Sequence, residues 1–148
     1  MKIAMSCDHY GYPLKLWLKA WLEGRGHTVM DMGCEGVEPV ATLLDDADKA
    51  FAAVVKGVAD RAIVVCMSGG ALAVRANKFD GLRAVVGWNV EVLKHDREAS
   101  DVNVLALAGH FVTPAEAERF VEVFLATPFE ALERRVKRLA RLAERPVV

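Results

Sequence analysis

The sequence predicts an α/β fold in which a parallel sheet of five strands is covered by helices on both faces. Short apolar or β-branched runs alternate along the chain with longer segments whose apolar residues recur at helical spacing. With 148 residues, of which 53% are hydrophobic, the chain is long enough to bury the core of one globular domain. We therefore expect a single domain, residues 1–148, built in three layers.

The expected strands and helices alternate along the whole chain. The strands are expected at residues 2–7, 27–32, 62–67, 83–88 and 103–108, and the helices at 14–26, 47–58, 70–78, 90–100, 114–126 and 129–145. In the first helix, Leu14, Leu18 and Leu22 fall at helical spacing. Thr113 is placed to cap a helix that begins with Pro114.

The last expected helix differs from the others because it is rich in arginine. Its apolar residues Leu132, Val136, Leu139 and Leu142 make only a narrow stripe. Such a helix at a chain end covers either its own sheet or that of a neighbouring molecule, and the sequence leaves both arrangements open.

Composition and charge argue against several classes of protein. The formal net charge of −1 gives no support to nucleic-acid binding. No apolar run approaches the roughly 20 residues that a membrane-spanning helix needs, and the first residues lack the features of a signal peptide, so we expect a cytoplasmic protein with no membrane contact. The cysteines Cys7, Cys34 and Cys66 form no C-x-x-C pair, which predicts free thiols rather than a disulfide framework or a structural zinc site.

Cysteine and polar residues gather where three of the expected strands end. Segments 7–9, 66–70 and 108–110 read Cys-Asp-His, Cys-Met-Ser-Gly-Gly and Ala-Gly-His. In an open parallel sheet, ligands bind beyond the carboxyl ends of the strands, where helix N-termini present free N–H groups. We therefore expect the site at this edge, with an oxyanion or a phosphate group as a suitable ligand.

Cys66 is the candidate base or nucleophile of this site. Gly69 and Gly70 carry no Cβ, so ligand oxygens can approach the backbone closely. The N-terminus of the following helix is expected to lower the pKa of the Cys66 thiol and so to favour the thiolate.

Each of these features also has a purely structural interpretation. Cysteine is among the most often buried residue types, so Cys7 and Cys34 are expected to be small apolar side chains of the core, and Cys66 taken alone is undecided. Asp8 and His9 suit the cap of a helix with an exposed imidazole. The convergence of the three segments favours a site.

Five stretches, together nearly the whole chain, resemble one family of enzymes. They read KIAMSCDHYGYPLK, GHTVMDMG, ADRAIVVCMSGGALAVRANK, GLRAVV and DVNVLALAGHFVTP. The family they resemble is that of the sugar-phosphate isomerases, which comprises type B ribose-5-phosphate isomerase and the two subunits of galactose-6-phosphate isomerase. The resemblance implies a Rossmann-like α/β/α fold and an enzyme that moves a proton between C1 and C2 of a sugar phosphate through an enediolate, without a cofactor.

The resemblance implies catalytic roles for the cysteine loop. Cys66 matches the cysteine that abstracts the proton, and Ser68 matches a Thr or Ser beside it. The amides of Gly69 and Gly70 match a loop that stabilises the enediolate oxygens.

Substrate-binding residues are also implied. Asp8 and His9 match residues that contact the sugar hydroxyls and, through the histidine, the phosphate, while His110 stands where the family has a phosphate-contacting arginine. Arg134 and Arg138 are the candidate cations of the C-terminal region. Because the family's active sites lie between subunits, we expect a homodimer or tetramer with shared sites.

Other positions depart from the family pattern. Ala99 and Ser100 replace the ring-opening histidine and the asparagine of H-N-x-A-N, with Ser100 kept as a candidate substrate contact. Met67 replaces a glycine of the cysteine loop, and Leu43 takes the place of a tyrosine of the substrate wall. The missing histidine predicts a substrate that needs no enzymic ring opening, such as a four-carbon or acyclic one, or a takeover of the role by His95 one turn earlier.

Two functions remain open. The first is an active isomerase with an altered substrate, because Cys66 and its loop are retained. The second is a catalytically weak subunit that binds a sugar phosphate or pairs with an unlike chain. A thiol redox protein has little support, since no second cysteine lies close to Cys66 in sequence. No metal is expected, because Asp8 and His9 are a pair and not three ligands.

Overall fold

The computed structural model describes residues 1–36 and 43–144, apart from the side chain of Leu43. In this part of the chain, five parallel strands form one sheet in the order β2-β1-β3-β5-β4. The strands are β1 (Lys2–Cys7), β2 (Thr28–Asp31), β3 (Arg61–Cys66), β4 (Ala84–Val86) and β5 (Val104–Ala108). The helices are α1 (Tyr12–Glu23), α2 (Leu43–Val55), α3 (Gly70–Ala76), α4 (Val90–Ser100), α5 (Pro114–Ala126) and α6 (Glu133–Ala143).

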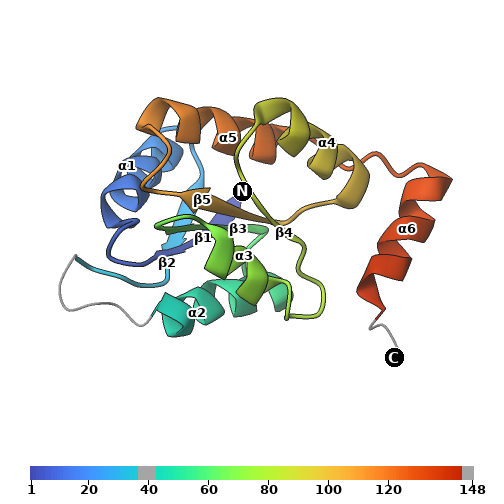
Figure 1. The fold of residues 1–148 in the computed structure, drawn as a ribbon, viewed down its shortest axis with the longest axis horizontal. Helices are drawn as coiled ribbons and strands as arrows, with labels where there is room; N and C mark the ends of the chain where they lie inside the picture. Colours follow the sequence, from blue (N-terminus) through green and yellow to red (C-terminus); the bar gives the residue numbers. More distant parts are fainter. Residues whose placement is uncertain (37–42, 145–148) are drawn as a thin grey trace.

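Helices cover both faces of the sheet, as the alternating pattern predicted. Figure 1 shows α1, α4 and α5 on one side of the sheet and α2 and α3 on the other. The Rossmann-like three-layer α/β/α fold with an extra C-terminal helix is therefore confirmed. None of the described helices is both long enough and apolar enough to cross a membrane.

The two faces of the sheet have separate cores because successive side chains of a strand point to opposite sides. In β3, Ile63 belongs to the core that contains Leu18 of α1. Val64 and Cys66 belong to the other core, together with Leu72 of α3. The sulfur of Cys66 therefore lies on the side of the sheet that α3 covers.

Most element boundaries agree with the sequence prediction to within two residues, and those of β1, α4 and α5 agree at both ends. The starts of α2 and α6 were predicted wrongly, because α2 begins earlier, at Leu43, and α6 begins later, at Glu133. Thr113 caps α5 as expected: its side chain accepts a hydrogen bond from the backbone of Glu116, whose carboxylate accepts one from the Thr113 N–H at 2.8 Å. Helix α1 begins at Tyr12, earlier than predicted, because Pro13 is tolerated in a first turn.

The C-terminal helix α6 is attached to α4 and covers neither face of its own sheet. Arg135 donates a hydrogen bond to the Glu98 carbonyl at 2.9 Å, and Arg138 donates one to the Ala99 carbonyl at 2.8 Å. Figure 1 shows α6 beside the sheet rather than over it. Most of the apolar stripe of α6 is exposed. Of the two arrangements that the sequence left open, cover of its own sheet is therefore wrong, and cover of a neighbouring molecule stays a prediction.

Candidate active site

Three loops meet at the carboxyl edge of the sheet, because β1, β3 and β5 are neighbours in it. The backbone N–H of Asp8 donates to the Val65 carbonyl at 3.0 Å. The N–H groups of Gly109 and His110 donate to the carbonyls of Cys66 and Met67 at 2.8 and 3.2 Å. The structure thus brings together the three segments that the sequence singled out.

Two glycines allow the outer loops to lie directly over the end of β3. A Cβ on Gly11 would lie 2.4 Å from the Val65 carbonyl oxygen, and a Cβ on Gly109 would lie 3.2 Å from the Gly11 Cα. A side chain at either position would separate the loops. Gly11 and Gly109 therefore hold Asp8 and His110 close to the cysteine loop.

The Cys66 thiol is buried at the start of a tight loop. Its side chain is 3% exposed, and the N–H of Gly69 donates to its sulfur at 3.2 Å. Gly69 has a φ of +77°, in the left-handed region that favours glycine, and ends the loop as the N-cap of α3. Met67 and Ser68, in between, are exposed, so Ser68 lies beside the thiol on the accessible side of the loop.

Burial raises the pKa of the Cys66 thiol above its ordinary value of 9.0. The N–H groups of Gly69, Ser68 and Leu72 lower this pKa, whereas the negative charge of Asp8 raises it. The expectation of a lowered pKa is therefore wrong for the chain by itself. The physical reason is that removal of the thiolate from water outweighs the favourable amide dipoles.

Asp8 is buried and has a structural role. Its Oδ1 accepts a hydrogen bond from the N–H of Gly11, the N-cap of α1, at 2.8 Å. The alternative interpretation of Asp8 as the helix cap is therefore wrong, because Gly11 is the N-cap and Asp8 binds only its N–H; the expected exposed imidazole is also wrong, because the Nδ1 atom of His9 is buried. The carboxylate also lies close enough to Cys66 to raise the pKa of its thiol, so it faces the candidate site as well.

The aromatic rings of His9, Tyr10 and His110 lie close together beside the cysteine loop. The rings of His9 and Tyr10 have centroids 4.0 Å apart, and those of Tyr10 and His110 are 5.9 Å apart. The Nδ1 atom of His9 is buried without a hydrogen-bond partner among the described residues. A buried polar atom left unpaired costs about 1–3 kcal/mol, so this nitrogen is suited to a ligand that supplies the missing partner.

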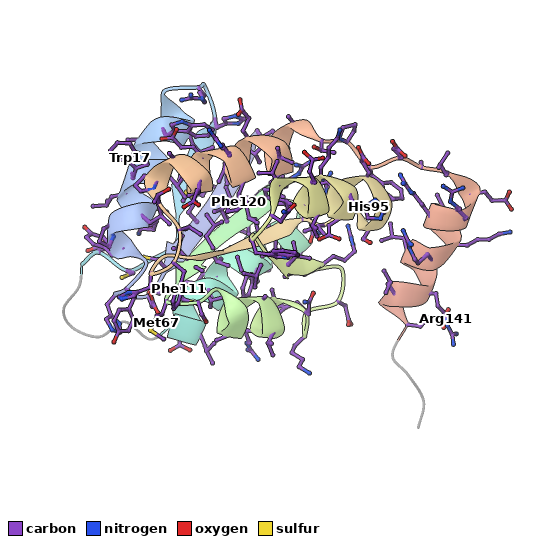
Figure 2. All side chains as sticks on the ribbon, turned by 45° about the horizontal axis from the view of Figure 1, so that its top comes forward. Trp17, Met67, His95, Phe111, Phe120 and Arg141 are labelled. Carbon is purple, nitrogen blue, oxygen red and sulfur yellow. The ribbon has the colours of Figure 1, made fainter. Side chains whose placement is uncertain are left out.

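The remaining predicted residues lie at the other end of the molecule. Figure 2 shows Met67 and Phe111 at one end, and His95 on α4 and Arg141 on α6 at the opposite end. Ser100 ends α4 and Arg138 is bound to the neighbouring Ala99 carbonyl. Within one chain, the structure therefore does not bring Ser100, Arg134 and Arg138 to the Cys66 loop.

The structure also adds residues that sequence reasoning missed. Tyr10 occupies the variable position of the C-D-H-x-G motif. Its ring contacts His9 and His110, and no pattern in the neighbouring sequence predicts this contact. Arg135 is 9% exposed and forms an ion pair with Glu130, so it fixes α6 rather than facing solvent. The wall position Leu43 is described only in its backbone, and its neighbour Thr42 lies outside the described residues.

A parallel α/β/α sheet with a cysteine loop, a buried carboxylate and two imidazoles at its carboxyl edge defines the class of α/β enzymes that bind small ligands there. The sequence profile of the family described as Ribose/Galactose Isomerase matches residues 3–142. The chain belongs to this family, which confirms the resemblance.

Individual relatives agree with this assignment. The chain is 34% identical to ribose-5-phosphate isomerase B of Mycolicibacterium paratuberculosis, over 97% of this chain and 91% of that protein. It is 30% identical to a 4-deoxy-4-sulfo-D-erythrose isomerase of a Clostridium species, over 87% of this chain and 81% of that protein. These relatives are sugar isomerases by name, and the expected enzyme class, aldose–ketose isomerase, is confirmed.

Solved structures show the same fold. Ribose-5-phosphate isomerase B of Clostridium thermocellum superposes with a TM-score of 0.92 at 35% identity, over 97% of this chain and 95% of that one. The enzyme of Thermotoga maritima gives a TM-score of 0.93 at 30% identity, over 97% of this chain and 98% of that one. The agreement extends over nearly the full length of both chains.

Proposed function

We propose that the chain is a cytoplasmic aldose–ketose isomerase that acts on a phosphorylated sugar, with residues 1–148 as a single catalytic domain. Membership of the Ribose/Galactose Isomerase family supports the reaction class. The observation that carries the proposal is the N–H of Gly69 directed at the sulfur of Cys66 at 3.2 Å, at the edge where a parallel sheet binds ligands. This hydrogen bond stabilises negative charge on the sulfur.

In the proposed mechanism, the Cys66 thiolate removes the proton from the carbon beside the substrate carbonyl. The electron pair of the broken C–H bond forms the enediolate, and the resulting thiol returns the proton to the neighbouring carbon. The hydroxyl proton moves at the same stage from the oxygen that becomes the new carbonyl to the oxygen of the former carbonyl. The N–H of Gly69 stabilises the thiolate, which leaves the amide of Gly70 and the hydroxyl of Ser68 for the enediolate oxygens. The raised pKa makes Cys66 a stronger base but a less populated one near neutral pH.

The substrate is proposed to need no enzymic ring opening. Ala99 has no acid or base group, and its side chain is 2% exposed, so it lines no open surface of its own chain. A four-carbon sugar phosphate is too short to form a stable furanose ring through its phosphorylated end. The relative named 4-deoxy-4-sulfo-D-erythrose isomerase, whose name refers to a four-carbon sugar, supports a substrate of this length. In the second version of this proposal, exposed His95 replaces the missing histidine.

The active site is proposed to be shared between subunits of a homodimer or tetramer. Ser100, Arg134 and Arg138 lie far from the Cys66 loop of their own chain, so they can contribute only to the site of a neighbour. Arg134 makes no hydrogen bond or ion pair with the residues that the structure describes, and its guanidinium is suited to phosphate. A cleft of about 610 Å³ between α6 and residues 77–83 leaves apolar side chains of α6 uncovered, which supports cover by a second copy.

The second candidate is a catalytically weak subunit that binds sugar phosphates. The raised pKa of the Cys66 thiol and the absence of an acid–base group at Ala99 favour it. Activity of the purified chain without an unlike partner would exclude this function.

The experiment measures kcat/KM of the purified chain for a four-carbon ketose phosphate and for ribose 5-phosphate. We expect the four-carbon substrate to be preferred, and Cys66→Ala to abolish solvent exchange of the C1 proton of the ketose and of the C2 proton of ribose 5-phosphate while substrate binding persists. Unchanged turnover in Cys66→Ala would contradict the mechanism. A clear preference for ribose 5-phosphate that survives His95→Ala would contradict both versions of the substrate proposal, and inactivity towards a full panel of sugar phosphates would favour the second candidate.

A further inference from the structure

We infer that Tyr10 is a positioning residue that holds the imidazoles of His9 and His110 together as one anion-binding pair for the charged end of the substrate. The inference rests on the proposed function only for the identity of that substrate. The binding of an anion by the two histidines is tested separately from turnover.

The geometry places the Tyr10 ring in contact with both imidazoles. The ring centroids of His9 and Tyr10 are 4.0 Å apart with an interplanar angle of 40°, and those of Tyr10 and His110 are 5.9 Å apart at 86°. The second value is an edge-to-face arrangement, in which aromatic rings attract each other. Tyr10 thus connects the loop after β1 to the loop after β5.

The backbones of the two loops also lie close together, at Gly11 and Gly109. A Cβ on Gly109 would lie 3.2 Å from the Gly11 Cα, so the loops pass each other as closely as glycine allows. This close passage places His110 within reach of the residue that follows His9. Because the contact joins separate loops, it controls the relative position of the two imidazoles.

The polar side-chain atoms of Tyr10 and His110 and the Nδ1 atom of His9 form no hydrogen bond with the residues that the structure describes. The Nδ1 atom of His9 is buried without a hydrogen-bond partner among the described residues. Within the same residues, neither the Tyr10 hydroxyl nor the ring of His110 forms a hydrogen bond. The nearby Asp8 carboxylate is partly engaged, because its Oδ1 accepts from the Gly11 N–H. Unpaired imidazole nitrogens beside the Cys66 loop are suited to the oxygens of an anion.

Tyr10 is too exposed for its main role to be stabilisation of the core. The side chain is 47% exposed, so it contributes little to the core, and replacement by another apolar residue is expected to preserve the fold. Figure 2 shows the neighbouring Phe111 at the same end of the molecule as Met67 of the cysteine loop. The ring of Tyr10 is therefore placed where it can affect ligand binding without stabilising the protein as a whole.

The test compares Tyr10→Leu, which removes the ring, with Tyr10→Phe, which keeps it, in the full-length protein. Inorganic phosphate is the probe, and its binding is followed through the NMR signals of the His9 and His110 rings. The matched control is Trp17→Leu, which removes an aromatic ring that is 54% exposed on α1. Thermal unfolding of each variant reports on the fold.

We expect phosphate to shift both histidine signals in the parent. Tyr10→Leu is expected to weaken phosphate binding by roughly three- to tenfold, the range that corresponds to loss of one aromatic pair. Tyr10→Phe and Trp17→Leu are expected to stay within about twofold of the parent. In turnover, Tyr10→Leu is expected to raise KM for the phosphorylated substrate with little change in kcat.

Phosphate binding by Tyr10→Leu equal to that of the parent would overturn the inference, as would a parent in which phosphate shifts neither imidazole. An equal loss in Tyr10→Phe and Tyr10→Leu would also overturn it, because the hydroxyl and not the ring would then be responsible. An inactive parent whose two histidines still respond to phosphate in a Tyr10-dependent way would refute the isomerase function and support the inference.

Discussion

Replacement of the two adjacent glycines of the cysteine loop is expected to give opposite results. Gly69 has a φ of +77°, and a Cβ there would lie 3.1 Å from the Val86 Cγ1 and 3.3 Å from the Leu107 carbonyl carbon. A Cβ on Gly70 would meet only the Ser68 Oγ, at an ordinary 3.7 Å. Gly69→Ala is therefore strained and crowded, whereas Gly70→Ala fits.

The magnitude follows from two contributions. A non-glycine residue in the left-handed region costs about 1–2 kcal/mol, and overpacking against backbone adds about 1–3 kcal/mol. We expect Gly69→Ala to lower the free energy of unfolding by about 2–5 kcal/mol, which corresponds to a Tm decrease of roughly 4–20 °C for a chain of this size. Gly70→Ala, at the first position of α3, is expected to remain within about 0.5 kcal/mol of the parent.

A third variant separates strain from crowding. Gly81 has a φ of +87°, but a Cβ there would meet nothing within 4 Å. Gly81→Ala is therefore expected to lose only the conformational contribution, about 1–2 kcal/mol. The assays are urea unfolding and isomerase turnover. Turnover is expected to fall by roughly ten- to a hundredfold in Gly69→Ala alone, because relief of the strain and crowding moves the backbone N–H of residue 69 away from the Cys66 sulfur. Equal stability of Gly69→Ala and Gly70→Ala would refute this reasoning.

Two further predictions concern the shared site and the thiols. Arg134→Ala is expected to raise KM for a phosphorylated substrate by roughly ten- to a hundredfold, because a charge-assisted contact is lost. The control is Lys137→Ala on the same helix, whose exposed ammonium pairs with Glu133; this variant is expected to change KM by less than about twofold. Equal kinetics of both variants would contradict a shared site that uses Arg134. Burial raises the pKa of the Cys66 and Cys7 thiols above 9.0, so kcat/KM is expected to increase with pH and to keep increasing above pH 9.0, where more thiolate forms. In the unfolded chain these thiols ionise near pH 9.0, so the stability that comes from keeping them protonated in the folded protein is complete below that pH and is lost as the pH rises towards their folded pKa values. A pH–rate profile that levels off below pH 8 would contradict the raised pKa of Cys66.

The sequence alone was sufficient to predict the α/β/α architecture and the edge that carries the candidate site. Period-two and period-3.6 patterns are local, and a start signal such as the Thr113 cap with Pro114 acts within one turn, so α4 and α5 were placed correctly at both ends. The location of the cysteine loop followed from a general property of parallel sheets, in which the carboxyl ends of the strands share one edge.

Features that depend on neighbours distant in sequence were decided only by the tertiary structure. Lysine side chains are mostly exposed in proteins, yet Lys15 of α1 is 1% exposed because its ammonium binds Asp31 at 2.6 Å and two backbone carbonyls. The pKa of Cys66 rises rather than falls because its burial depends on α3 and the opposite core, which no local motif encodes. The contact of Tyr10 with His110 joins residues from two different loops. The detachment of α6 from its own sheet likewise appears only when α4 and α6 are placed in space, because hydrogen bonds from Arg135 and Arg138 hold α6 against the end of α4 and away from the core.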